Sequence, residues 1–133
     1  MKAVLNIIGK LWALPTTLLF GLPFGLLGLC LSPFRKDKRV FIRFEYNSIC
    51  FYNHPLLHGD AGAVTLGNVI AFQEDGPHFK GIEIGDHEKQ HTLQAEMLGI
   101  FYIPLYLIFM LKHGPLPSHP MERGPYSRPP RPW

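Results

Sequence analysis

An uncharged stretch from Leu11 to Leu31 is the feature that most constrains what this chain can fold into. It is built from Leu, Phe, Gly and Ala, with Pro15 and Pro23 inside it. About 20 apolar residues span a bilayer as a helix, and membrane helices tolerate Gly and Pro. The stretch therefore predicts a retained N-terminal membrane anchor over residues 1–34. A cleaved signal peptide is the alternative, but the run is longer than a signal core and has no clean small-x-small cleavage site.

A basic cluster, Arg35 to Arg39, follows the apolar stretch, whereas Lys2 and Lys10 are fewer on the other flank. Lys and Arg beside a membrane segment favour its cytoplasmic side, so we expect the rest of the chain to face the cytoplasm. The net charge of +3 fits contact with anionic membrane lipid. Basic and aromatic residues do not interleave into a binding platform, so no nucleic-acid partner is expected.

Several segments after the basic cluster have the composition of β-strands. Residues 40–46 carry apolar side chains at alternate positions, and Asn47-Ser48 marks a turn before a second strand at 49–52. Residues 63–72 predict a third strand, with Gly67 and Asn68 in its middle as a bulge or a close backbone approach. Together with the helix described next, the strands predict an α+β fold in which a short antiparallel sheet packs on that helix.

The segment His87 to His91 reads His-Glu-Lys-Gln-His, two histidines four apart with a glutamate beside the first. Positions four apart share one face of a helix, so both imidazoles reach one metal ion while Glu88 points to where a bound water would lie. This is the pattern of a zinc peptidase, in which the glutamate is the catalytic base. A solvated polar helix turn is the alternative, because a chain with seven histidines can match three fixed positions by chance.

Residues near the motif extend the prediction. Gln94 lies on the same helical face as the two histidines, so we expect it to line the substrate cleft or to hydrogen-bond a ligand; an ordinary polar helix residue is the alternative. Glu96 is offset to another face and is not expected to bind the same ion. The helix begins either at His87 with Asp86 as its cap, or near Ile82.

A second apolar run, residues 97–111, follows the motif and has Pro104 at its centre. At about 15 residues it is short for a span, so a re-entrant or membrane-lying helix and a buried core helix are equally open. The chain thus divides into an anchor (1–34), a core (35–112) and a proline-rich tail (113–133). A catalytic zinc ion generally has three protein ligands, and the tail offers three candidates for the third: His113, His119 and Glu122.

The segment Val64–Phe72, followed by His87–Gln94, resembles the minimal core of small bacterial metallopeptidase-like domains of the zincin type. In that family a strand ending in a similar Gly-x-x-Ile-x-Phe pattern precedes an HExxHxxQ helix. The segment Pro120–Arg123 resembles the Asn-Pro-x-Glu element that supplies the third ligand of glutamate-type zincins. The similarity covers roughly residues 62–126.

The resemblance implies zinc as the cofactor, bound by His87, His91 and Glu122, with Glu88 as the base. It implies a peptide or protein substrate, which we expect to add as a strand along the edge at Gly67-Asn68. Combined with the anchor, the expected protein is a zinc metallopeptidase of the bacterial inner membrane with its core on the cytoplasmic side. The alternative is a small non-catalytic membrane protein whose zincin-like fold is structural or binds a partner.

Overall fold

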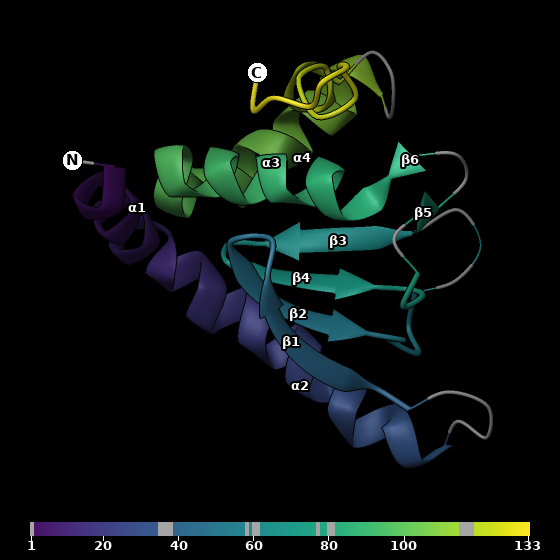
Figure 1. Cartoon of the computed structure of the whole chain (residues 1–133). Coiled ribbons are helices and arrows are strands. Elements are labelled where there is room, and N and C mark those ends of the chain that lie inside the picture. The colour runs from purple at the N-terminus through teal and green to yellow at the C-terminus, as the bar shows by residue number, and fades with distance from the viewer. Residues whose placement is uncertain are drawn as a thin grey trace.

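The computed structural model describes residues 2–34, 39–57, 59, 62–76, 78–79, 82–114 and 119–133 (Figure 1). Most of the basic cluster, residues 35–38, lies outside the described residues. The helical elements are α1 (Lys2–Thr16), the π-helical turn η1 (Thr17–Gly21), α2 (Leu22–Leu31), η2 (Ser32–Phe34), α3 (Ile84–Leu98), η3 (Gly99–Phe101), α4 (Tyr102–His113) and η4 (Pro120–Glu122). The strands are β1 (Phe41–Glu45), β2 (Ser48–Tyr52), β3 (Ala63–Leu66), β4 (Val69–Phe72), β5 (His78–Phe79) and β6 (Ile82–Glu83).

The predicted α+β class is confirmed, but the main sheet is mixed rather than antiparallel. Its strand order is β1-β2-β4-β3; β1 with β2 and β4 with β3 are antiparallel, whereas β2 and β4 are parallel. The prediction of one strand over residues 63–72 is wrong, because the chain reverses at Gly67. Gly67 has a φ of +69° and Leu66 pairs with Val69, which makes a two-residue hairpin turn.

Strand β4 lies between β2 and β3, and all four of its residues are buried. An apolar strand without alternation is typical of a sheet covered on both faces. On one face Ile70 and Phe72 pack with Ile84 of α3. On the other face Val69 packs against Leu22 of α2. The edge strand β3 runs beside α3, so the sheet edge and the motif helix are neighbours (Figure 1).

The N-terminal helical segment packs across the sheet and α3 through a face of small residues (Figure 1). A Cβ on Gly21 would lie 2.4 Å from the Leu66 carbonyl oxygen, and a Cβ on Gly25 would lie 2.3 Å from the Phe51 ring. Small residues let a helix approach its neighbours closely, as between membrane helices. We call this the small-residue face; its buried members are Gly9, Ala13, Thr16, Thr17, Gly21, Gly25 and Gly28.

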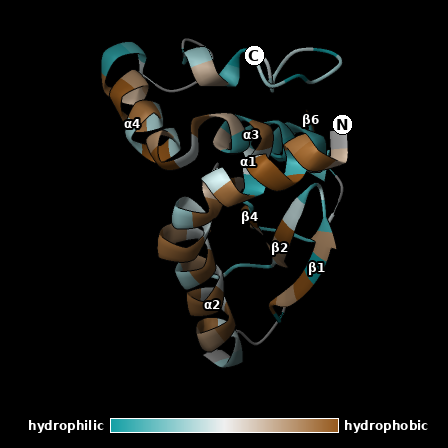
Figure 2. Ribbon diagram, turned by 90° about the vertical axis from the view of Figure 1, so that its left-hand side faces the viewer, coloured by the Kyte–Doolittle hydropathy of each residue, from teal (hydrophilic) through white to brown (hydrophobic). Residues whose placement is uncertain are grey.

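The opposite face of this segment is apolar and exposed. Leu11 and Leu19 are 63% and 69% exposed, and the outer surfaces of α1, α2 and α4 share this character (Figure 2). Two helical segments, Ala3–Leu31 and Ile84–His113, are long and apolar enough to cross a membrane by length and composition. Only 28% of the most apolar window of each is buried, whereas a core helix of a soluble protein is mostly buried.

The second apolar run is not one straight helix. Helix α3 ends at Gly99, whose φ of +58° places it in the left-handed region. Helix α4 has 12 residues, or about 18 Å at 1.5 Å per residue, which is short of the roughly 30 Å hydrocarbon core. The run therefore spans a bilayer only as part of the longer α3–η3–α4 segment.

The proline-rich tail packs against the core. Met121 of η4 is fully buried in a cluster with Ala13 of α1, Ala95 of α3 and Tyr102 of α4. The rest of the tail, residues 123–133, forms turns above α3 (Figure 1). Elements from both ends of the chain thus meet around α3.

A substitution in the small-residue face tests this packing, because the packing and helix propensity predict opposite changes in folding stability. Helix propensity alone predicts that Gly25→Ala stabilises an exposed helix by about 0.8–1.0 kcal/mol. We expect the opposite, a lower midpoint of thermal unfolding in detergent, because the added Cβ overlaps the Phe51 ring. Leu26→Ala on the adjacent exposed face is the control and should change stability by no more than about 0.5 kcal/mol. A stabilised Gly25→Ala variant would mean that this face does not pack on the sheet.

Candidate metal centre

The start of α3 places both histidines inside the helix. The helix begins at Ile84, so His87 and His91 stand within regular turns rather than in a frayed end. Gly85 permits this start, because a Cβ there would lie 2.2 Å from the Tyr46 ring that crosses the first turn. Asp86 lies in that turn, where a carboxylate is favourable to the helix dipole.

The three predicted ligands converge, although Glu122 is far from the histidines in the sequence. One carboxylate oxygen of Glu122, Oε2, lies 3.1 Å from His87 Nε2 and 3.0 Å from His91 Nε2. Tetrahedral zinc with bonds of about 2.0–2.2 Å separates its ligand atoms by roughly 3.3–3.6 Å. The observed separations are therefore a few tenths of an ångström from those of a zinc site.

Electrostatics favour a cation at this convergence point. His91 Nδ1 lies 2.9 Å from Gln94 Oε1 and His91 Nε2 lies 3.0 Å from Glu122 Oε2, so both ring nitrogens face oxygen atoms that can only accept. An imidazole lone pair and a carboxylate oxygen repel each other unless a proton or a metal ion lies between them. Burial by itself raises the pKa of Glu122, but hydrogen bonds to His87 and His91 outweigh it and hold the pKa well below its ordinary value. The carboxylate is therefore ionised, as a metal ligand must be.

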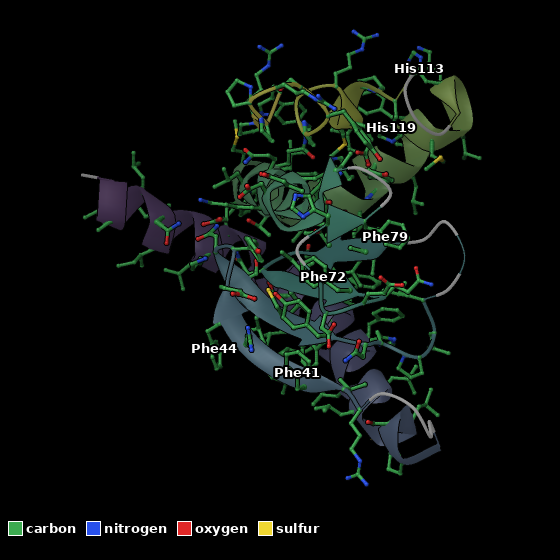
Figure 3. The ribbon with its side chains drawn as sticks, turned by 45° about the vertical axis from the view of Figure 1, so that its right-hand side comes forward. Phe41, Phe44, Phe72, Phe79, His113 and His119 are labelled. Atoms are coloured by element: carbon green, nitrogen blue, oxygen red, sulfur yellow. The ribbon has the colours of Figure 1, made fainter. Side chains whose placement is uncertain are left out.

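Glu122 is positioned by helix α4. The Tyr106 hydroxyl donates to Glu122 Oε1 at 2.6 Å, which leaves Oε2 facing the histidines. The ring of His119 accepts from the Met121 amide at 3.1 Å and donates to the Tyr106 carbonyl at 2.9 Å, so both of its nitrogens are engaged. His113 is exposed at the end of α4, beyond His119 (Figure 3). Of the three tail candidates, the structure brings only Glu122 to the histidines.

Gln94 hydrogen-bonds a predicted metal ligand, which is one of the two roles expected for it, and does not line the cleft described below. Its side chain is fully buried, and its amide nitrogen donates to the carbonyls of Met121 at 2.7 Å and Pro132 at 2.5 Å. Its oxygen accepts from His91 Nδ1. Gln94 therefore orients His91, a candidate metal ligand, and joins it to the tail; hydrogen bonds of this kind commonly support metal-bound imidazoles.

Glu88 is close to the ligands without being paired to them. Its Oε2 accepts from the Thr65 hydroxyl at 2.6 Å, and its Oε1 is 4.0 Å from His87 Nε2. Ligand atoms of His87, Glu88 and His91 all lie within 4.8 Å of one another. By distance alone, Glu88 could therefore bind an ion together with the two histidines, or face a molecule bound at that ion.

A cleft of about 250 Å³ opens beside these residues. Strand β3 and helix α4 form its two walls, and Glu88, His91 and Glu122 lie on its inner surface. Gly67 and Asn68, which we expected to hold the substrate, do not line it. Their turn faces η1 instead, where the main-chain N–H of Asn68 donates to the Thr17 hydroxyl at 2.9 Å. The sheet edge that borders the cleft is β3 itself.

Three residues of the centre were not predicted: Thr65, Tyr106 and Tyr126. Thr65 pairs with Ile70, whose side chain packs toward α3. Recognition of two strands within residues 63–72 would therefore have placed Thr65 on the face of the sheet that meets α3. The Tyr126 ring packs on His87 at a centroid distance of 4.1 Å. No pattern in the sequence marks either tyrosine, because both come from segments whose fold depends on tertiary contacts.

Glu96 occupies a separate polar network, in accord with its expected position on another face. It accepts from the amides of Asn6, at 3.2 Å, and Asn47, and lies 3.9 Å from Lys10 Nζ. The network joins α1, α3 and the β1–β2 turn.

Comparison with known proteins found no match: no family model, curated protein or solved structure is similar to this chain. The interpretation of the centre therefore depends on its own chemistry. Two imidazoles and one carboxylate are a common ligand set of catalytic zinc, and the spacing and orientation described above fit that ion.

Substitution of the tail carboxylate tests the ligand set. Glu122→Gln keeps the shape of the side chain but removes its charge, so we expect the zinc content of the purified protein to fall from about one ion per chain to near zero. His113→Ala should keep its zinc, because His113 is remote from the centre. Elemental analysis after dialysis measures both. Zinc retained in Glu122→Gln and lost in His113→Ala would reverse the assignment.

The buried amide of Gln94 can be tested against a neighbour on the same helix. Gln94→Ala should weaken zinc binding by about 10–100-fold, the usual effect of removing a partner of a metal-binding histidine. Gln90→Ala is the matched control, because Gln90 hydrogen-bonds only the Asp86 carbonyl in the described structure. Competition with a fluorescent zinc chelator gives both affinities. Equal affinities would show that Gln94 does not support His91.

Proposed function

We propose that this protein is a membrane-anchored, zinc-dependent peptidase with a zincin-type centre. The observation that carries the proposal is the convergence of His87, His91 and Glu122 at the edge of a cleft that also holds Glu88. Metal-binding residues alone are compatible with a structural site. A second carboxylate beside them, lining a cleft, is typical of a hydrolytic site.

In the proposed reaction His87, His91 and Glu122 hold the metal. When bound, zinc lowers the pKa of water and polarises a carbonyl oxygen. Glu88 then takes a proton from the attacking water and passes it to the leaving amine, which keeps the proton count balanced over the step. The Thr65 hydroxyl donates to Glu88 Oε2 and so holds the Glu88 side chain beside the centre.

Strand β3 is suited to hold the peptide. Among the described strands it pairs only with β4, and its other side borders the cleft. An extended peptide can add to such an edge through main-chain hydrogen bonds. Thr65, in the middle of β3, bonds to Glu88, so a peptide on this edge passes directly beside the proposed base.

We further propose that the exposed apolar faces of α1–α2 and α4 contact membrane lipid, with the sheet and the metal centre on the cytoplasmic side. The side is favoured by the basic residues of the sequence after the first helical segment. The small-residue face then holds the domain against its own anchor instead of leaving it on a flexible tether.

Membrane association is tested by extraction and protease protection. We expect the full chain to stay with the membrane pellet after carbonate washing, because large apolar side chains along Ala3–Leu31 are exposed outside the small-residue face and would be buried in lipid. Residues after Phe34 should resist protease added outside intact cells. A shortened soluble chain would show instead that the N-terminal segment is a cleaved signal, and the cytoplasmic side would be abandoned with it.

The role of Glu88 is tested by a substitution that separates metal binding from catalysis. Glu88→Gln keeps the hydrogen bond to Thr65 but cannot accept a proton, so peptide hydrolysis should fall by at least about 10²–10⁴-fold while zinc content is unchanged. Lys89→Gln, the next position of the helix, is the control. Hydrolysis that persists at the wild-type rate in Glu88→Gln would show that another group is the base.

A further inference from the structure

We infer that the cleft accepts an extended apolar segment that reaches it from the membrane, so that the substrate is a membrane-embedded or membrane-bound polypeptide. This inference rests on the proposed function, since it names the substrate class of the same centre. It depends on three features: the lining of the cleft, its position among the exposed apolar helices, and the free edge of β3.

The lining of the cleft is apolar outside the metal centre. Val64 and Leu66 contribute from β3, and Ile103 and Leu107 contribute from α4. The remaining charged groups of the lining, the side chains of Glu88, His91 and Glu122, are engaged in the centre. Within the described residues the cleft thus offers apolar surface to the side chains of a substrate and no free charge to pair with a charged one.

The wall formed by α4 also belongs to the exposed apolar surface of the molecule. Leu107 lines the cleft and is 55% exposed, and the neighbouring Ile108 and Leu111 are 57% and 89% exposed. Helices α2 and α4 lie on the same side of the molecule, and both are apolar there (Figure 2). The Trp12 and Phe101 rings, 6.3 Å apart, connect the outer surfaces of α1 and η3. A segment that enters beside α4 therefore comes from the face that we assign to lipid.

The edge of β3 that faces the cleft can supply backbone hydrogen bonds that an apolar substrate loses when its helix unwinds. A polypeptide in lipid must satisfy its backbone hydrogen bonds internally, so it is helical and resists hydrolysis. An extended segment loses those bonds, and an unpaired strand edge replaces part of them. To replace these bonds for an apolar segment, the strand edge must lie at an apolar opening. Strand β3 lies at such an opening, because its edge borders the apolar cleft.

Peptide binding to the full-length Glu88→Gln protein in phosphatidylcholine vesicles tests the inference. The probes are two fluorescein-labelled peptides of equal length, one with Leu, Ile and Phe around its centre and one with Ser, Gln and Glu at those positions. We expect the apolar peptide to bind at least about tenfold more tightly, after subtraction of binding to protein-free vesicles, because burial of a few methylene groups suffices for that ratio. Equal affinity, or preference for the polar peptide, would overturn the inference.

Two matched variants separate the cleft from general attraction to apolar surface. Leu107→Gln places an amide in the cleft wall and should remove most of the preference, whereas Leu111→Gln changes an exposed residue of α4 outside the cleft and should keep it. An equal loss in both variants would mean that the peptide binds to the outer surface only. Thermal unfolding shows that each variant is folded.

Zinc content and cleavage distinguish failure of this inference from failure of the proposed function. A wild-type protein that binds zinc and cleaves the polar peptide at least as fast as the apolar one keeps the peptidase proposal but contradicts the apolar substrate. A protein that binds no zinc and cleaves neither peptide contradicts the peptidase itself.

Discussion

The approach of one Glu122 oxygen to two imidazole nitrogens is the contact on which the C-terminal half of the structure depends. Such a cluster of lone pairs is stable only with a cation or protons between the atoms. It joins η4 to the motif helix, while Tyr106 ties the same carboxylate to α4. Gln94 adds two hydrogen bonds to tail carbonyls. An ion bound there would therefore stabilise the fold of the tail as well as complete a site, since binding to the folded state adds to its stability.

The N-terminal helical segment has two different faces. Small residues allow it to lie against the sheet and α3, and large apolar residues cover the side away from them. The polar network of Lys10 and Glu96 is turned toward the protein, which leaves the outer surface apolar. In consequence the N-terminal segment is part of the core packing, and Leu107 of the cleft wall adjoins the exposed apolar residues of α4.

Sequence reasoning succeeded where a pattern is local and failed where contacts between distant segments decide. The spacing of His87 and His91 is enough to place both on one helix face, and the α+β class follows from the strand and helix composition. The resemblance singled out Glu122, which no periodicity could have done. At Gly67 a bulge or a close backbone approach was expected; the close approach to Thr17 is present, but the reversal of the chain was not predicted, because a hairpin turn and a bulge use the same residues and differ only in how β3 pairs. The hydrogen bond of Gln94 to a predicted ligand was expected, but its bonds to Met121 and Pro132 were not, because residues 123–133 have no regular structure.

The central claim is that two histidines and one carboxylate of this chain bind a zinc ion. X-ray absorption spectroscopy of the zinc-loaded, full-length protein in detergent tests it most directly. The account predicts only nitrogen and oxygen neighbours at about 2.0–2.2 Å, with the multiple-scattering pattern of two imidazoles. Sulfur neighbours at about 2.3 Å, which would point to Cys30 or Cys50, or the scattering of a single imidazole, would contradict it.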